Sequence, residues 1–274
     1  MSSPRKGVNT SLSNHDDHNK YASILKTKKL GKAIEHYAKI DSTQDLALKR
    51  AEEGIEDGYV IIADQQTKGR GQFGKRWASN NPAGLWFSIV LRPKLRPSEV
   101  QHLTLLTAIV MAEAIESITQ IKPLIKWPND LLIDDKKVAG ILTEMKAERN
   151  QVKYVVIGIG LNVNQEISDF DLNINERATS LKVEAKETFQ KRLLIEEILT
   201  TFEIHYQAYL KNGFDHIKQK WLQSAYRLGQ MLDYTIDGVK KQGVFVGIDD
   251  QGALLVKDEQ NQLQPLYSAK IKWF

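Results

Sequence analysis

Residues 68–77, KGRGQFGKRW, combine three glycines, four cationic side chains and a closing tryptophan within ten positions. Such a segment cannot lie in a core, because it offers little apolar surface to offset the burial of so many charges and backbone amides. Glycine lets main-chain N–H groups approach a ligand, Arg and Lys supply positive charge, and the indole offers a flat apolar face. The composition favours a loop that wraps a polyanion such as a nucleotide, and a solvated surface turn is the alternative.

Two familiar nucleotide motifs fit this sequence poorly. Residues 69–75 follow the G-x-x-x-x-G-K order of a P-loop, but position 76 is Arg, which supplies no hydroxyl for Mg²⁺, and a turn and strand follow where a helix is required. Gly158 and Gly160 follow a strand, as in a dinucleotide fingerprint, but position 163 is Val and no β-α-β unit is evident. Both motifs leave the loop unexplained.

Five segments taken together carry a more specific pattern. They are DSTQD (41–45), QTKGRGQFGKRW (66–77), KWPNDLLI (126–133), KKVAGILTEM (136–145) and IGIGLNVN (157–164). In this order and spacing the sequence resembles the biotin protein ligases, from about residue 34 to the C-terminus. The resemblance implies an enzyme that joins biotin to ATP, giving biotinyl-5′-adenylate and pyrophosphate. Biotin then passes to one lysine of a carrier domain on a biotin-dependent carboxylase.

The resemblance implies a biotin pocket made of strands and a few aimed polar groups, as a neutral bicyclic urea with an apolar tail requires. Ser42, Thr43 and Gln44 would meet the ureido ring, and Gln66 would add a polar contact. Strand residues near 85–89 and 140–142 would enclose the ring and tail. The set implied for biotin is Ser42, Thr43, Gln44, Gln66, Arg70, Gly71, Gln72, Lys137 and Gly140.

The resemblance also implies that Arg70 and Lys137 are the catalytic pair. A carboxylate and a triphosphate repel each other, and two cations would neutralise them and stabilise the charge that develops on the α-phosphate. Lys75 and Arg76 would hold pyrophosphate. No covalent enzyme intermediate is required, so the lack of cysteine is no objection.

At the nucleotide end, Trp77 would stack on adenine and Asn162 would bond its edge. Asp130, together with Asn129, would hold Mg²⁺ through oxygen atoms, directly or through water. The set implied for ATP and the adenylate is Gly69, Arg70, Lys75, Arg76, Trp77, Asn129 and Asn162.

Each piece also has a purely structural interpretation. Residues 127–130 could form a turn with an anchoring tryptophan, residues 136–137 could be solvated hairpin lysines, and residues 42–43 could cap a helix. Gly158 and Gly160 could be packing glycines. A lipoate or octanoate protein ligase shares the fold, but a dithiolane ring has no partner for the polar set at 42–44 and 66. A basic nucleic-acid-binding module is a third possibility, which the net charge of +4 disfavours.

The sequence departs from the family pattern in two places. The family loop usually reads G-R-G-R, whereas the fourth position here is Gln72, so one charge-assisted contact to the adenylate is absent. We expect Arg70, Lys75 or Arg76 to compensate for it; otherwise the intermediate should leak faster. Only about 32 residues precede the first core strand, and an N-terminal winged helix needs about 60. We therefore expect no operator DNA binding.

The elements that must position these residues form an α/β (α+β) fold, a mixed sheet backed by helices. The predicted segments are a basic, partly disordered stretch (1–32), a catalytic domain (33–226) and a small SH3-like β-barrel (227–274). Strands are expected at 33–40, 59–63, 85–91, 124–127, 131–133, 138–145 and 152–163, with short β-strands at 244–248 and 253–257.

Helices are predicted after residue 41, ending at Gly54, and after Pro97, where an almost wholly apolar segment should be the central packing helix. His102, near its start, should serve packing or capping. Two further helices are expected at 186–212 and 214–225. The inner face of the first should carry Leu193, Leu194, Ile198, Phe202 and Tyr206.

Composition sets the remaining bounds. The 274 residues are 42% hydrophobic and 26% charged, typical of a soluble globular protein. No run approaches the ~20 apolar residues of a membrane span, no signal peptide is visible, and no cysteine is present, so we expect a cytoplasmic protein without a membrane partner. The histidines and aspartates at 15–18 fit a solvated tail better than a metal site, and Asn14 could cap a short helix. Monomer and homodimer stay open.

Overall fold

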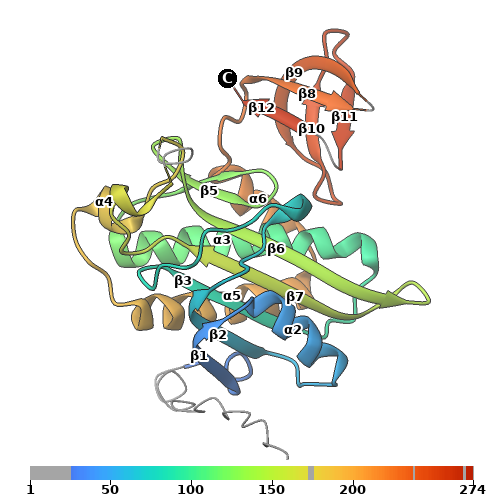
Figure 1. Ribbon diagram of the computed structural model, residues 1–274. Helices are drawn as coiled ribbons and strands as arrows, with labels where there is room; N and C mark the ends of the chain where they lie inside the picture. Colours follow the sequence, from blue (N-terminus) through green and yellow to red (C-terminus); the bar gives the residue numbers. More distant parts are fainter. Residues whose placement is uncertain (1–25, 172–175, 237, 268–269, 274) are drawn as a thin grey trace, which may run out of the picture.

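A seven-stranded mixed sheet forms the larger part of the molecule (Figure 1). The computed structural model describes residues 26–171, 176–236, 238–267 and 270–273. The strand order is β1-β2-β3-β7-β6-β5-β4, with β1 parallel to β2 and all other neighbours antiparallel. The bounds are β1 Ile34–Ile40, β2 Tyr59–Gln66, β3 Leu85–Leu91, β4 Leu124–Lys126, β5 Asp130–Ile133, β6 Lys136–Glu148 and β7 Gln151–Leu161. The predicted mixed sheet is confirmed.

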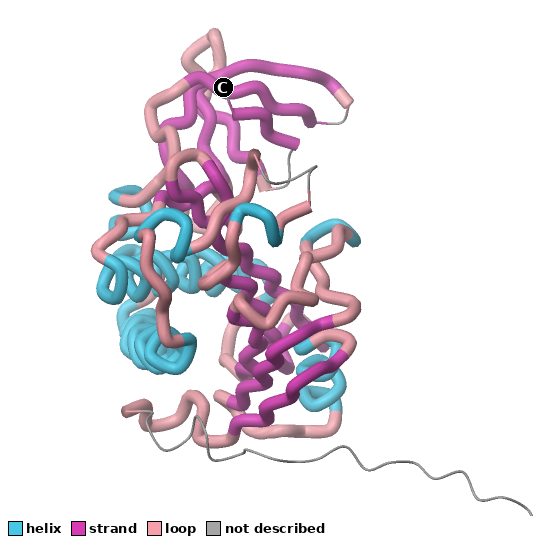
Figure 2. The backbone as a smooth tube through the Cα atoms, turned by 60° about the vertical axis from the view of Figure 1, so that its left-hand side comes forward, coloured by secondary structure: helices cyan, strands magenta, loops and turns pink. Residues whose placement is uncertain are grey.

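Helices cover both faces of this sheet, which explains the apolar runs in its central strands (Figure 2). Helix α2 (Thr43–Glu52) contacts β2, β3 and β7 on one face. Helix α3 (Val100–Thr119) contacts β4, β5 and β6 on the other, and α5 (Lys191–Asn212) and α6 (Asp215–Gln223) pack on α3. All seven residues of β3, LWFSIVL, are therefore buried.

Helix α3 is the central packing helix that its sequence predicts. A 3₁₀ turn at Pro97–Glu99 precedes it, and fifteen of its twenty residues are buried. Of the residues that the structure describes, only the segment Pro97–Thr119 is long and apolar enough to cross a membrane, and 78% of its most apolar window is buried inside the protein. It is thus accounted for as a core helix.

Helix α5 differs from its prediction at the N-terminus. The expected helix at 186–212 begins at Lys191, because a short helix α4 (Leu181–Ala185) ends at Lys186 in the left-handed conformation (φ 60°). Leu194, Ile198, Phe202 and Tyr206 are buried as predicted, whereas Leu193 is 45% exposed, so its assignment to the inner face was wrong.

A second, five-stranded antiparallel sheet has the order β11-β10-β9-β8-β12. Its strands are β8 Met231–Ile236, β9 Val239–Ile248, β10 Leu254–Lys257, β11 Leu263–Leu266 and β12 Lys270–Trp273. The predicted small β module is confirmed, while its likeness to an SH3 barrel and the three segment boundaries stay predictions.

The turn between β9 and β10 attaches this small sheet to the main body. The indole of Trp127 donates to the carbonyl of Gly252 at 3.0 Å, and the Nε2 atom of His102 lies 2.9 Å from the carbonyl of Asp250. The His102 ring stacks on Phe214 with centroids 3.9 Å apart, which confirms its packing role. Gly252 is close to α3: a Cβ there would lie 2.8 Å from Leu105.

The N-terminal segment is described from residue 26 onward, so the proposed cap at Asn14 and the cluster at 15–18 lie outside the described residues. The described part is anchored on α5. Backbone N–H groups of Lys28, Lys29 and Leu30 donate to the carboxylate of Glu203 at 2.5, 2.7 and 3.1 Å.

The helical layer contains an ion-pair cluster that joins α3, α5 and α6. Glu113 lies 2.6 Å from His205 Nε2 and accepts a hydrogen bond from Lys220 Nζ at 2.6 Å. The bond to His205 is the main cause that lowers the pKa of Glu113 to about 2, with Lys220 adding to it against the opposing effect of burial.

This pKa predicts a loss of stability in acid. Because the pKa of Glu113 is below its ordinary value of 4.5, its stabilising contribution is complete above about pH 4.5 and disappears as the pH falls toward 2. We expect Glu113→Gln to lower the free energy of unfolding at pH 7 by about 1 kcal/mol, after allowance for partial solvent exposure. Urea unfolding of both proteins at several pH values should show this difference shrinking below pH 4.5. A pH-independent difference would contradict the assignment.

Candidate functional site

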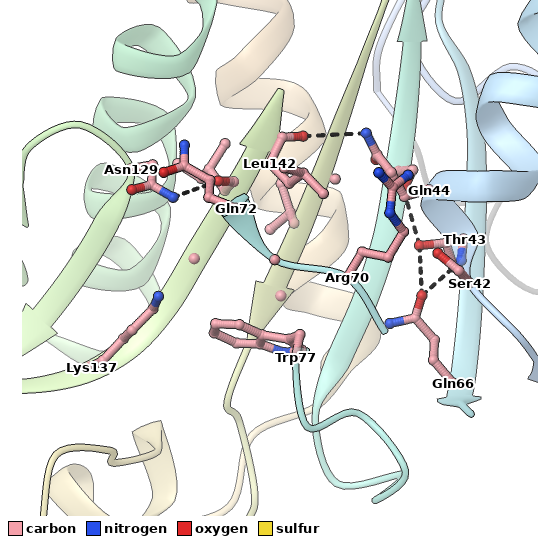
Figure 3. Close-up of a pocket in the computed structure, with 17 residues that line it drawn as sticks. Ser42, Thr43, Gln44, Gln66, Arg70, Gln72, Trp77, Asn129, Lys137 and Leu142 are labelled. Atoms are coloured by element: carbon pink, nitrogen blue, oxygen red, sulfur yellow. Dashed lines mark hydrogen bonds between the residues drawn. The ribbon is translucent and has the colours of Figure 1, made fainter. Parts of the chain in front are cut away.

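The glycine-rich loop after β2 forms a short hairpin over the sheet (Figure 3). The Trp77 N–H donates to the Gly69 carbonyl at 2.9 Å, and the Gly71 N–H donates to the Lys75 carbonyl at 2.8 Å. A 3₁₀ turn at Gln72–Gly74 closes the tip, where Phe73 adopts φ 55° and is 85% exposed. These bonds turn Arg70, Gln72 and Trp77 toward the sheet.

Beneath this hairpin lies a pocket of about 460 Å³. Segments far apart in sequence line it: the start of α2, the end of β2, the hairpin, β3, Asn129, β6 and β7. All nine residues that the resemblance implies for biotin line this one pocket, and so do Trp77 and Asn129. Its lining also includes Ser88, Ile141, Leu142, Gly158, Ile159 and Gly160.

A second pocket of about 680 Å³ is also lined by Trp77 and Lys137, so these two residues border both pockets. It contains Arg76 and Asn162 from the predicted nucleotide set, together with Phe170, Arg177 and Ala178. These last three were missed, because they lie in an irregular segment after β7 that carries no motif. Gly69 and Lys75 line neither pocket: Gly69 packs against Ser79 and Trp77, and Lys75 is exposed at the loop surface.

A continuous chain of hydrogen bonds crosses the polar end of the first pocket. The Gln66 Oε1 atom accepts from the Thr43 N–H at 2.7 Å, and the Thr43 and Ser88 hydroxyls lie 3.0 Å apart. The Ser88 hydroxyl donates to Gln44 Oε1 at 3.2 Å. Ser42 is the N-cap of α2 and accepts from the Asp45 N–H at 3.3 Å, so the helix-cap interpretation is correct for this residue. Ser88 was missed, since a buried serine in an apolar strand gives no sequence signal.

Arg70 is held by two carboxylates. Glu144 accepts from Nη2 at 2.7 Å and from Nη1 at 3.0 Å, and Asp45 accepts from Nη1 at 2.8 Å. Partial burial acts to lower the pKa of Arg70, but the bonds and charges of Glu144 and Asp45 outweigh it, so the pKa is raised. Three of the five guanidinium N–H groups are engaged, which leaves Nε–H and one Nη2–H for a ligand.

Lys137 is the second cation of the pocket. Its Nζ atom lies 2.5 Å from Asp130 Oδ1 and 4.9 Å from the centroid of the Trp77 ring. Its backbone is fixed by bonds to the Arg177 carbonyl (2.8 Å) and from the Thr179 N–H (3.0 Å). Arg70 and Lys137 therefore share one cavity, as an adenylating site requires, and Lys137 is not a merely solvated hairpin lysine.

Glycines on β6 and β7 make room for the site side chains. Gly140 is paired with Gly160 in the β6–β7 register. A Cβ at Gly160 would lie 2.5 Å from the Trp77 ring, and a Cβ at Gly158 would lie 2.5 Å from Gln44 Oε1. The packing and functional interpretations of these glycines thus coincide, because the side chains packed against them line the pocket.

The residues near Lys137 fit a magnesium ion that arrives on a triphosphate. Asn129 donates its amide to the Ile141 carbonyl at 2.8 Å, which leaves Oδ1 as an oxygen ligand beside the Asp130 carboxylate. Within the described ranges, no group of three or more His, Cys, Asp or Glu could hold a metal by itself. One carboxylate plus substrate phosphates and water is a common Mg²⁺ arrangement.

Comparison with known proteins agrees with this geometry. Residues 37–162 match the Biotin/lipoate A/B protein ligase family, and residues 233–271 match the Biotin protein ligase C terminal domain. The chain is 39% identical over 249 residues to the Bifunctional ligase/repressor BirA of Bacillus subtilis, covering 90% of this chain and 76% of that protein. It is 32% identical over 227 residues to a Biotin--[acetyl-CoA-carboxylase] ligase of Paracoccus denitrificans, covering 80% and 92%.

Among solved structures, a biotin protein ligase from Aquifex aeolicus in complex with biotin and ATP aligns with a TM-score of 0.75 at 28% identity, covering 90% of this chain and 99% of that one. The match to the Biotin protein ligase C terminal domain agrees with the biotin ligases named among the relatives. From the shared fold, the shared domains and these identities, we conclude that the chain belongs to the biotin protein ligases, a family of ATP-dependent ligases.

Proposed function

We propose that this chain activates biotin with ATP to give biotinyl-5′-AMP and pyrophosphate, and then transfers biotin to a lysine of a biotin carboxyl carrier domain. One observation carries the proposal: Arg70 and Lys137 border the same pocket as the polar chain of Gln44, Thr43, Ser88 and Gln66. The site thus combines cations for two anions with polar groups for a neutral ring.

The polar end of the pocket suits the ureido ring of biotin. A cyclic urea offers one carbonyl acceptor and two N–H donors. Because Gln66 Oε1 is engaged by Thr43, the Gln66 amide presents its NH₂ group as a donor. The Thr43 and Ser88 hydroxyls donate to neighbouring side chains, so their oxygen atoms can accept from a ligand. A dithiolane ring has no carbonyl or N–H group to bond with this set, so it would gain none of these hydrogen bonds.

In the adenylation step, a biotin carboxylate oxygen forms a bond to the α-phosphorus of ATP, and the bond from that phosphorus to the pyrophosphate oxygen breaks. The free Nε–H and Nη2–H of Arg70 offer two donors to an anion. Lys137 supplies a second positive charge. These cations reduce the repulsion between the two anions and stabilise the charge that develops on the phosphoryl oxygens.

The nucleotide would occupy the region around Trp77, with Arg76 and Arg177 available to phosphates in the second pocket. Asn162 donates to the Thr179 carbonyl at 2.9 Å and accepts from Gln165 at 3.2 Å, so its second amide N–H and one lone pair of Oδ1 are left for adenine. Asp130 and Asn129 would hold Mg²⁺, which neutralises phosphate charge when bound.

In the transfer step, the carrier lysine must arrive as a free amine. Its nitrogen attacks the carbonyl carbon of the mixed anhydride, the bond from that carbon to the AMP oxygen breaks, and the amine loses a proton. The pocket beneath the hairpin is open enough at its mouth that Arg70, Asp45 and Glu144 all remain partly exposed.

The activity is tested by the release of pyrophosphate from ATP. We expect release with biotin and none above background with lipoate or octanoate, because only the ureido ring satisfies the polar chain. Labelled biotin should become attached to a purified carrier domain and not to the same domain with its acceptor lysine changed to Arg. ATP use that depends on lipoate instead would assign the chain to the other branch.

Substitutions at two glycines of β7 should distinguish the biotin end of the site from the nucleotide end. Gly158→Ala places a methyl group against Gln44, so we expect biotin affinity without ATP to fall about tenfold. Gly160→Ala places one against Trp77, so we expect the KM for ATP to rise about tenfold with less effect on biotin. Calorimetry and steady-state kinetics measure both. Identical effects of the two variants on both ligands would contradict this division.

Gln72 predicts a leaky intermediate. An Arg at this position would add a charge-assisted bond, so we expect Gln72→Arg to slow the release of biotinyl-5′-AMP about tenfold. The release rate is measured by rapid gel filtration of preformed complex without acceptor. Gln260→Arg, which adds the same charge on the exposed β10–β11 turn, serves as the control. Equal rates for wild type and Gln72→Arg would refute the leak.

A further inference from the structure

Glu144 has no role in the reaction steps proposed above, although it contacts residues of the site. It lies on β6 opposite Val156 of β7, about a third exposed, beside the mouth of the first pocket. Its carboxylate accepts from Gln44 Nε2 at 2.9 Å and from both terminal nitrogens of Arg70 at 2.7 and 3.0 Å. One side chain thus contacts the polar end and the cationic end of the site.

The contact with Gln44 is the shortest of three that fix which way its amide faces: Nε2 lies 2.9 Å from Glu144, 3.3 Å from the Val156 carbonyl and 3.5 Å from the Leu142 carbonyl. An ionised carboxylate only accepts hydrogen bonds, so it requires the NH₂ group of Gln44 on its side. The Gln44 carbonyl oxygen is then directed to the Ser88 hydroxyl at 3.2 Å. Because the Ser88 hydrogen is then directed at Gln44, the Ser88 oxygen is the acceptor for the Thr43 hydroxyl, which lies 3.0 Å away. Glu144 therefore stands at one end of the hydrogen-bond chain that would read the ureido ring.

The contact with Arg70 decides which donors remain for substrate. Glu144 binds the guanidinium end-on, with one oxygen on each terminal nitrogen, and Asp45 takes the remaining Nη1 hydrogen. The Nε–H and the second Nη2–H are left together on one side of the guanidinium. A bidentate carboxylate pair fixes an Arg plane far better than a single contact does.

We propose that Glu144 is a positioning residue that sets the donor and acceptor pattern of the biotin pocket and the orientation of Arg70 at the same time. The inference rests on the proposed function, since it names how that site is organised. Asp45 shares only the role of orienting Arg70, because its carboxylate accepts a hydrogen bond from Arg70. The Gln44 amide donates to Glu144. A simple surface ion pair, by contrast, contributes little to stability and would leave ligand binding unchanged.

The two carboxylates supply a matched comparison. In Glu144→Gln, one acceptor oxygen becomes an NH₂ group that must face either Gln44 or Arg70. We expect the Kd for biotin without ATP, measured by calorimetry, to rise about tenfold, with a similar rise in the KM for biotin and a fall in kcat. In Asp45→Asn we expect the biotin Kd to stay within twofold of wild type and kcat to fall.

Glu148→Gln is the control, because Glu148 lies at the far end of the same strand, where its carboxylate pairs with Lys153. It should leave Kd and kcat unchanged. If Glu144→Gln does not fold, Glu144→Asp keeps the charge but shortens the reach, and a rise in Kd of at least threefold is expected. A biotin Kd within twofold of wild type in the folded Glu144 variant overturns the inference. Failure of the wild type to bind biotin would instead refute the proposed function.

Discussion

Two carboxylates form ion pairs with the guanidinium of Arg70, and the geometry of the pocket depends on these ion pairs. Asp45 comes from α2, Glu144 from β6 and Arg70 from the hairpin after β2, so the pairs join three segments that are far apart in the chain. They act together with the packing of Trp77 on Gly140 and Gly160, which also holds the hairpin against the sheet. Lys137 repeats the principle with Asp130 at 2.5 Å. Each of the two cations that line the pocket is thus held by a carboxylate of the chain itself.

Prepaired cations meet two demands at once. A partly buried positive charge is costly unless it is paired, and a site that joins two anions needs positive charge at a fixed place. The carboxylates satisfy the first demand without using every donor, because Arg70 retains two N–H groups. The Trp77 ring packs on the backbone of the glycines at 140 and 160, close to Lys137. Charge, ring and backbone are positioned together, so the proposed adenylation would require little reorganisation of the protein.

The sequence predicted the sheet, the central helix and the pocket lining well, because these follow from apolar runs and from motifs that are local in the chain. It did not predict which side chains pair. Glu144 reaches Arg70 and Gln44 only through the register of β6 beside β7, and Ser88 is an ordinary residue of an apolar strand. Arg177 follows no motif. The error at Leu193 has another cause: on α5 it lies about 100° away from Leu194, so it does not share the buried face formed by residues 194, 198, 202 and 206.

The small β-sheet also contributes to this geometry, although it lies outside the pocket. Its β9–β10 turn accepts the indole N–H of Trp127, two residues before Asn129. On the other side, Asn129 is bound to Ile141 twice, through its side chain at 2.8 Å and its carbonyl at 2.9 Å. The segment that carries Asp130 is therefore fixed from both directions, and Asp130 in turn holds Lys137. Three contacts thus link the distant turn to Lys137, which makes the second sheet part of the framework of the candidate site.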